Sequence, residues 1–242
     1  LKDLPPNVAV LQLHAINPFG MSHYIRTNEN GVDLNRNWID FNKPPQVDPD
    51  YDAIFDALPT ISKPSYENAE LWLRAYKDLV DRHGRWTVSN ALTSGQYHRK
   101  DGLGFGGTEP QWSQLAVEKA LNELLGTPRH IVYLDWHTLL RTGDGNLIFL
   151  CFNQTGDPLF ERAGRWWGHD AVDRQNVNAQ WATGTAAAPK RASRKGLMMW
   201  GIQHHLAPRA DIAGAVIEFC TEPHPTKTPE QMETFEMLCE QY

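Results

Sequence analysis

Short apolar runs of strand length alternate with helix-like stretches along this chain. The runs lie at residues 8–16, 131–136, 147–152 and 213–219. Each is continuously apolar rather than strictly alternating, which is typical of strands covered on both faces of a sheet. Because runs of this kind alternate with helix patterns, the sequence predicts an α/β layered domain.

The helix patterns carry their own start and stop signals. Apolar residues recur at helical spacing over residues 69–80, and Ser65 is placed to cap that helix. A second stripe over residues 117–125 is closed by Gly126. A last helix is expected to start at Thr228, with Gln231 completing a capping box. The polar stretches 42–64 and 84–110 remain, as loops that are functional or that carry short elements.

Composition excludes several classes of protein. The 242 residues contain 23 Lys and Arg against 29 Asp and Glu, a formal net charge of −6, so a nucleic-acid partner is not expected. No apolar stretch approaches the roughly 18 residues of a membrane-spanning helix. The three cysteines are too far apart for a disulfide framework or a metal knuckle. They indicate a reducing compartment, and we expect a cytoplasmic protein.

Asn35 and Arg36 form a polar pair among apolar neighbours, shortly after Arg26. A guanidinium group binds a carboxylate at two points, and a neighbouring amide can add a further hydrogen bond. The pair therefore suggests an anion site. The alternative is an arginine that simply pairs with a local acid, Asp33 or Asp40.

Two further residues interrupt apolar strands. His137 follows the run 131–136, so it should emerge near the carboxyl end of a central strand, where ligands of open α/β sheets gather. The alternative is a core histidine bonded to Asp135 or to the backbone. Glu218 lies within the run 213–219 and, if held in a cleft with a raised pKa, would suit general-base work. Its alternative is a glutamate at a sheet end that pairs with an arginine.

Other patterns in the sequence give weaker evidence for a function. The glycines between 102 and 107 lack the ending of a phosphate-binding loop, so we interpret this stretch as a mobile loop. The spacing of His169 and Asp173 is more typical of a solvated helix face than of a metal site. Motifs of serine and cysteine hydrolases are absent from the sequence.

Taken in order, the motifs resemble those of the zinc carboxypeptidase superfamily, and within it a bacterial subgroup of uncharacterised carboxypeptidase-like proteins. The resemblance covers residues 4–222. It is carried by Asn-Pro-Phe-Gly at 17–20, Arg26, Val-Asp-Leu-Asn-Arg-Asn at 32–37, Asp-Trp-His-Thr at 135–138 and Ile-Glu-Phe at 217–219. It implies a three-layer α/β/α fold with a mixed, mostly parallel central sheet.

The resemblance also implies roles for individual residues. His137 would be a zinc ligand, and Glu218 the general base that activates water. Asn35 and Arg36 would hold the terminal carboxylate of the substrate, and Arg26 would stabilise the developing oxyanion. The implied activity is that of a zinc-dependent metallopeptidase of carboxypeptidase type, which hydrolyses an amide bond next to a free carboxylate.

One element of the family pattern is missing from the sequence. The superfamily takes two further zinc ligands from an H-x-x-E motif, and no histidine here has a glutamate three residues later. We therefore expect residues 1–242 to be a single, N-terminally incomplete catalytic domain with one zinc ion, whose other two ligands lie upstream of Leu1. Two alternatives stay open: an N-acyl amino acid deacylase, like aspartoacylase or succinylglutamate desuccinylase, and a non-catalytic protein that binds carboxylates.

Overall fold

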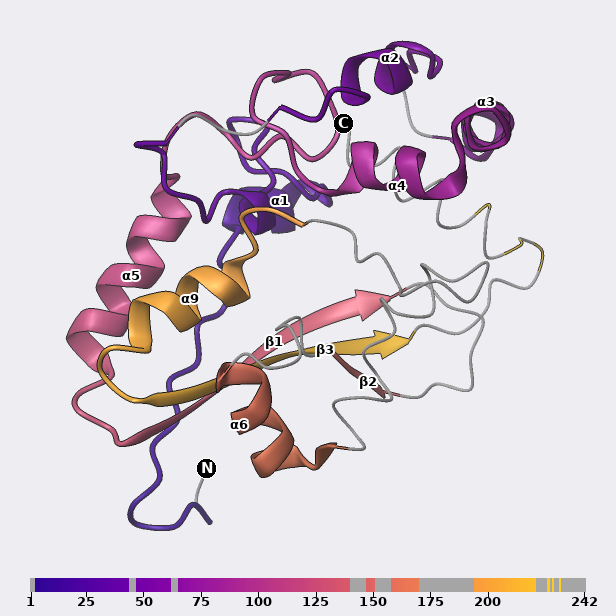
Figure 1. Cartoon of the computed structure of the whole chain (residues 1–242). Helices are drawn as coiled ribbons and strands as arrows, with labels where there is room; N and C mark the ends of the chain where they lie inside the picture. Colours follow the sequence, from indigo (N-terminus) through magenta and orange to yellow (C-terminus); the bar gives the residue numbers. More distant parts are fainter. Residues whose placement is uncertain are drawn as a thin grey trace.

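A three-stranded mixed sheet organises one part of the molecule (Figure 1). The computed structural model describes residues 3–43, 47–61, 65–139, 147–150, 158–169, 194–220, 226, 228 and 231. Strand β1 (His130–Leu139) pairs in parallel with β3 (Asp211–Cys220), and β2 (Leu147–Leu150) pairs antiparallel with β3 on its other side. The predicted strands at 131–136 and 213–219, and the described part of the run 147–152, are confirmed.

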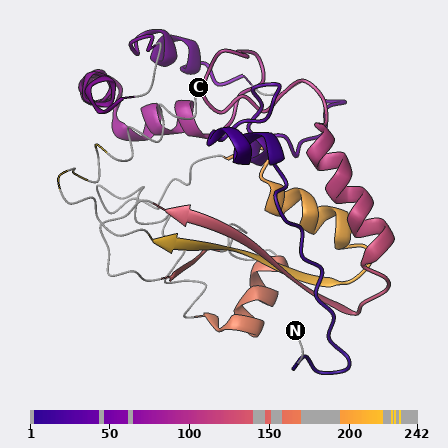
Figure 2. The same ribbon diagram turned by 180° about the vertical axis from the view of Figure 1, so that it is seen from behind.

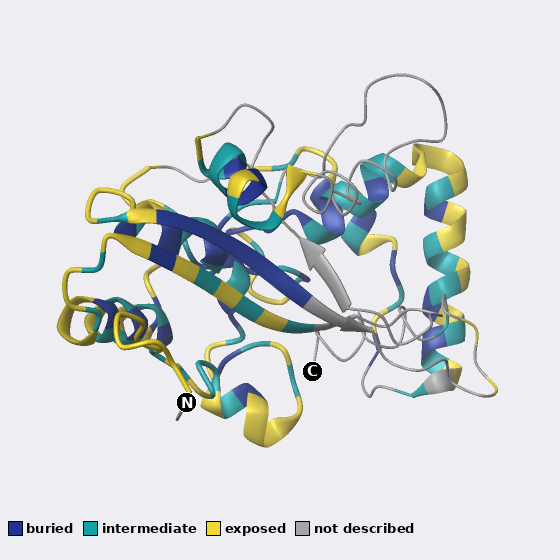
Figure 3. Ribbon diagram, turned by 90° about the horizontal axis from the view of Figure 1, so that it is seen from below, coloured by how far each residue is buried: buried dark blue, intermediate teal, exposed yellow. Residues whose placement is uncertain are grey.

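Helices lie on both sides of this sheet (Figures 1 and 2). On one side α5 (Trp112–Leu124) and α9 (Met198–Leu206) pack their apolar residues against Ile131 and Ile212. On the other side α6 (Pro158–Trp167) packs against Ala213. Because neighbouring positions of β3 face opposite sides, the strand is buried on both, as its unbroken apolar run predicts. Figure 3 shows the buried β3 beside β1, whose exposure alternates.

A second apolar core is built by the helices α2 (Tyr51–Asp56), α3 (Tyr66–His83) and α4 (Arg85–Thr93). The side chain of Ser65 accepts a hydrogen bond from the Asn68 amide, so the predicted cap of α3 is confirmed. Helices α2 and α4 are the short elements that the polar stretches 42–64 and 84–110 contain. The whole arrangement is a mixed α/β fold.

Two helix ends predicted from the sequence are also confirmed. Helix α5 ends just before Gly126, which adopts a left-handed conformation with φ of 67°. At the start of the last predicted helix, Thr228 and Gln231 exchange hydrogen bonds between side chain and main-chain amide, as a capping box does. The rest of that helix lies outside the described residues.

The first apolar run is not a strand, and this prediction is wrong. Residues 8–16 follow an extended path without strand pairing in the described structure, and Val8 and Val10 are exposed. Leu11, Leu13 and Ile16 pack against the core between α5, α9 and the sheet. Burial therefore alternates along residues 10–14, as in an extended segment. In the described structure, however, no neighbouring strand forms main-chain hydrogen bonds with this segment.

The chain then turns through a short helix, α1 (Pro18–His23), into the segment that carries Arg26. The 3-10 helix η1 (Leu34–Arg36) follows shortly after. In the described part of the chain, none of the helices is both long and apolar enough to cross a membrane.

Candidate functional site

The Asn-Pro turn at residues 17–20 positions Arg26. The Asn17 side chain accepts from the Gly20 amide and donates to the carbonyl oxygens of Arg26 and Thr27, at 3.0 and 3.1 Å. These bonds tie the start of α1 to the segment that follows it. The half-exposed Arg26 side chain then places its Nε 2.9 Å from Oδ2 of Asp33.

Asp33 is a buried carboxylate between two arginines. Its Oδ1 accepts from the Asn35 amide at 2.8 Å, and its Oδ2 lies 4.0 Å from Nη1 of Arg36. Burial alone would raise the pKa of Asp33, but Arg26, Arg36 and the Asn35 amide together hold it below its usual range. The carboxylate is therefore charged at neutral pH and balances part of the surrounding positive charge.

Arg36 is only 4% exposed, and its donors point to main-chain oxygens. Nε and Nη2 donate to the Thr93 carbonyl at 3.2 and 2.8 Å, and Nη1 donates to the Asn35 carbonyl at 2.7 Å. Oδ1 of Asn35 accepts from the Met198 amide at the start of α9. In this arrangement the pair joins η1 to α4 and α9, and its role as a carboxylate clamp stays a prediction.

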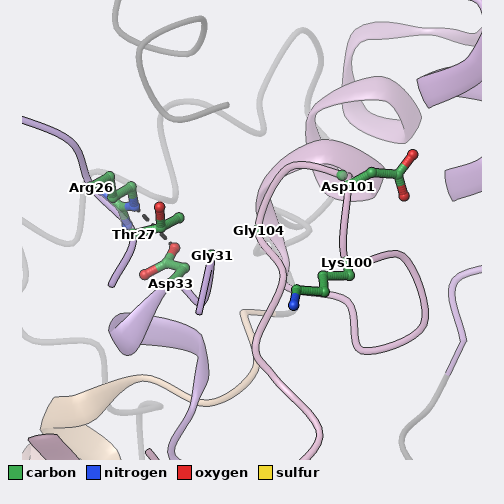
Figure 4. A pocket seen from close by; sticks show the side chains of 8 residues that line it. Arg26, Thr27, Gly31, Asp33, Lys100, Asp101 and Gly104 are labelled. Carbon is green, nitrogen blue, oxygen red and sulfur yellow. Dashed lines mark hydrogen bonds and ion pairs between the residues drawn. The ribbon is translucent and has the colours of Figure 1, made fainter. Parts of the chain in front are cut away.

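A cavity of about 80 Å³ opens between the Arg26–Asp33 segment and the glycine-rich loop (Figure 4). It is lined by Arg26, Thr27, Gly31, Asp33, Lys100, Asp101, Gly102 and Gly104. The loop is well packed rather than the loose segment that its glycines suggested. Leu103 and Phe105 are buried, Gln96 bonds the Gly104 and Gly106 main chain, and the Phe105 carbonyl accepts from the Asp33 amide.

Sequence reasoning missed Lys100. Nothing in its neighbourhood marks it, because an exposed lysine in a glycine-rich loop is an ordinary surface residue. Only the fold brings the loop beside Arg26 (Figure 4).

His137 and Glu218 meet at the carboxyl ends of β1 and β3. The two positions are partners in the parallel register, so their main chains run side by side, about 4.8 Å apart as in any sheet. The side chain of Glu218 lies outside what the structure describes, so the choice between general base and arginine partner stays open. His137 is not among the described residues that line the Arg26–Lys100 cavity.

A carboxylate accompanies His137. Nε2 of His137 lies 3.1 Å from Oδ2 of Asp135. Asp135 is largely buried and stands two positions earlier on the same face of β1. The structural alternative for His137 was a hydrogen bond to Asp135, whereas the two groups form a close contact in which Oδ2 accepts no hydrogen bond. A carboxylate at this place does not oppose a metal role, because metal-binding histidines usually give their second ring nitrogen to a carboxylate. Burial and the Asp135 charge also raise the pKa of Tyr133, the next residue on that face.

The donor chemistry therefore fits one metal ligand with its carboxylate partner. Among the residues whose placement is described, no three His, Cys, Asp or Glu side chains gather into a metal site. Cys151, Cys239 and Asp173 lie outside the described residues.

The fold and these sites define a mixed α/β protein with a small polar cavity, lined by residues of both charges, and a histidine–carboxylate pair at a strand end. The model of the family described as "Protein of unknown function (DUF2817)" matches residues 1–236, so the chain belongs to that family. The curated proteins and the solved structures contain no match to it.

Proposed function

We propose that the chain belongs to a zinc-dependent hydrolase of carboxypeptidase type, which cleaves an amide bond next to a free carboxylate. One observation carries the proposal: the Asp135–His137 pair stands at a strand end in register with Glu218 on the neighbouring strand. A histidine held by a carboxylate, beside a glutamate in an apolar strand, is the combination that metal-assisted hydrolysis needs. The ordered motifs described above support the same assignment, including a three-layer fold.

His137 would hold the metal, together with two ligands that we propose come from outside the 242 residues. When bound, zinc would polarise the substrate carbonyl and lower the pKa of a water molecule. Asp135 lies 3.1 Å from Nε2 as a close charged neighbour rather than a hydrogen-bond partner, and a small rotation of the ring would let Nε2 donate to it and leave the lone pair of Nδ1 for the metal. Asp135 thus prepares the ring for a cation.

The other residues take the roles that the resemblance implies. Glu218 would accept the proton of the attacking water and pass it to the leaving amine. Arg26 would face the negative charge that develops on the carbonyl oxygen. Asn35 and Arg36 would hold the terminal carboxylate, which requires Arg36 to exchange a main-chain oxygen for the substrate. A cytoplasmic location is part of the proposal, from the cysteine usage.

The proposal is tested on the full natural chain with two substrate series, N-acyl dipeptides and N-acyl amino acids. Release of the terminal amino acid from the first identifies a peptidase, and release of the acyl group from the second identifies a deacylase. We expect Glu218→Gln to lower the rate by roughly 10²–10⁴. Glu123→Gln, on the exposed face of α5, is the matched control and should keep the rate.

Zinc content supplies a readout that does not depend on turnover. His137→Ala should lower the zinc content of the purified protein, and His83→Ala, an exposed histidine at the end of α3, should not. A Glu218→Gln rate within about tenfold of the unchanged protein refutes the general-base role. Binding of a peptide without turnover in either series would identify a carboxylate-binding protein instead.

A further inference from the structure

We infer that Gln111, the residue directly before α5, is a positioning residue for Arg26 and acts through the buried side chain of Asn28. The role of Arg26 in a reaction rests on the proposed function. The positioning of its side chain rests on hydrogen bonds of the described residues alone.

Asn28 closes the turn that separates Arg26 from Asp33. Its Oδ1 accepts hydrogen bonds from the main-chain amides of Asn30 and Val32, at 3.0 and 2.9 Å. Its own main-chain amide donates to the Val32 carbonyl oxygen at 3.0 Å. Arg26 and Asp33 lie on the two arms of this turn, and their side chains meet across it (Figure 4). The direction of the Arg26 side chain therefore depends on the conformation of the turn.

Gln111 holds this turn from outside. Its Oε1 accepts from Nδ2 of Asn28 at 2.8 Å and from Nδ2 of Asn30 at 2.9 Å. Gln111 is 6% exposed and Asn28 is 3% exposed. A buried amide that loses its partner is left unsatisfied, which is costly, so the two bonds restrict the turn to one conformation.

The main chain of Gln111 is fixed by Asn37, which follows η1. Oδ1 of the completely buried Asn37 accepts from the Gln111 amide at 2.8 Å, and its Nδ2 donates to the carbonyl oxygens of Gly106 and Glu109. Three buried amide side chains thus connect the start of α5, the turn and η1. Because they are neutral, they fix the turn without adding a charge that would compete with Asp33 for the Arg26 guanidinium.

The place of Gln111 in the sequence separates this role from the stability of α5. Gln111 is the N-cap residue of that helix, where Ser, Thr, Asn and Asp are preferred because their short side chains accept a hydrogen bond from the first turn. In the described structure the Gln111 side chain makes no such bond with α5. It reaches Asn28 and Asn30 instead, 83 and 81 positions away along the chain. The side chain therefore stabilises the turn rather than the helix that it precedes.

Solvent exchange of the Arg26 Nε proton measures how firmly this side chain is held. Nε donates to Asp33, and its NMR signal in the full natural chain is assigned by its loss in Arg26→Lys. Gln111→Met keeps the size of the side chain but accepts no strong hydrogen bond. We expect it to speed the exchange by about tenfold, because both bonds that restrict the turn are lost.

A second buried glutamine provides the matched control. Gln203 on α9 is completely buried, and its Oε1 accepts from the Gly214 amide of β3 at 3.2 Å. Gln203→Met should lower the stability in urea, as Gln111→Met does. It should leave the Arg26 exchange unchanged, because the exchange of this half-exposed side chain reports local opening rather than global unfolding.

Two further variants test the contact itself. Gln111→Glu keeps an oxygen that can accept from Asn28 and Asn30, so it should keep the exchange slow. Asn30→Ala removes one of the two bonds at an exposed residue, so it is expected to fold and should speed the exchange by a smaller factor.

Turnover of the two substrate series gives a second readout. If Arg26 meets charge that develops only in the transition state, Gln111→Met should lower kcat severalfold and leave KM nearly unchanged. Gln111→Glu should keep kcat, and Gln203→Met should change neither constant.

An Arg26 exchange rate in Gln111→Met equal to that of the unchanged protein overturns the inference, and so does an equal acceleration in Gln203→Met. Neither measurement requires zinc or turnover. If neither substrate series is hydrolysed and only the Gln111 contact changes the exchange, the positioning of Arg26 stands and the proposed function is wrong. If hydrolysis depends on Glu218 but kcat is unchanged in Gln111→Met, the inference is wrong and the proposed function stands.

Discussion

At the scale of single residues, Asp33 connects more of the site than any catalytic candidate does. Its carboxylate faces Arg26 on the cavity side and Arg36 on the buried side, and its main-chain amide holds the glycine-rich loop through Phe105. The sequence offered Asp33 as a partner of Arg36. The structure makes Arg26 its closer partner, because η1 carries the Arg36 guanidinium toward α4.

Asp33→Asn is expected to destabilise the protein by about 3 kcal/mol, because it leaves Arg36 buried without its counter-charge. The effect depends on pH. The pKa of Asp33 is lower in the folded than in the unfolded protein, so its contribution is present above about pH 5 and is lost as the pH falls below about 4.

Urea unfolding from pH 3 to pH 7 measures this difference. The stability gap between the unchanged protein and Asp33→Asn should narrow as the pH falls. Asp40→Asn, an exposed carboxylate beside Lys43, is the matched control and should leave the stability nearly unchanged at every pH, because exposed ion pairs contribute little. A gap that stays constant over the whole range would contradict the assigned role.

Asp135 is the second residue whose role can be separated from folding. If it orients the His137 ring, Asp135→Ala should weaken zinc binding by roughly 10–100-fold, whereas Asp135→Asn, which keeps an oxygen at the same place, should weaken it less. Competition with a chelator measures the affinity, and the spectrum of the cobalt-substituted protein reports the geometry. Identical zinc affinities of the unchanged protein, Asp135→Ala and Asp135→Asn would show that Asp135 has no role in zinc binding.

At the scale of elements, the sequence was informative where a segment carries its own signals. β3 follows from an apolar run that is typical of a strand covered on both faces, whereas β1 has the same kind of run but exposes Val132, Leu134 and Trp136 on one face. The helices α3 and α5 follow from their stripes and caps. The run 8–16 was misread, because a short apolar run that ends at a turn signal indicates an extended segment but not that another strand bonds to it. The helices α2 and α4 are too short for a clear stripe.

The entry to α9 depends on Gly196. It has φ of 63°, and a Cβ there would overlap the main-chain oxygen of Arg36. Gly196→Ala should therefore cost at least about 2 kcal/mol, from the unfavourable conformation and from overpacking. Gly126→Ala is the control, since its φ is 67° but its Cβ would meet nothing within 4 Å.

Thermal unfolding of the two variants separates the two causes. Gly126→Ala should lose only the conformational part, about 1 kcal/mol, and the difference between the variants is the cost of the close approach to Arg36. Equal losses in both would show that the α9 entry can shift away from η1.

At the scale of the whole molecule, polar bonds between residues 36 and 97 join the two apolar cores. The Tyr97 hydroxyl donates to the Arg36 carbonyl at 2.7 Å, and Arg36 donates to Thr93 at the end of α4. The sequence does not reveal these hydrogen bonds, because the partners are far apart along the chain and no local motif marks either of them. For the same reason it could identify Arg26 but not Lys100.

Tyr97→Phe tests whether this junction couples the cores. Its buried hydroxyl bond is worth about 1 kcal/mol, as is that of Tyr51, which donates to Leu103 at 2.8 Å beside the α2–α4 core. Both variants should lose similar stability. In hydrogen exchange, only Tyr97→Phe should let one core open at a lower free energy than the other, and a uniform loss in both variants would contradict the coupling.

The parallel register of β1 and β3 has a consequence for any attempt to redesign the protein. His137 and Glu218 are register partners because ten residue pairs, beginning with His130 and Asp211, are aligned along the two strands. A slip by one residue would turn every side chain of β1 to the opposite face. The separation of the two candidate reactive groups is therefore a property of the whole strand pair, and an insertion or deletion near residue 130 would act on the chemistry as strongly as a substitution at residue 137.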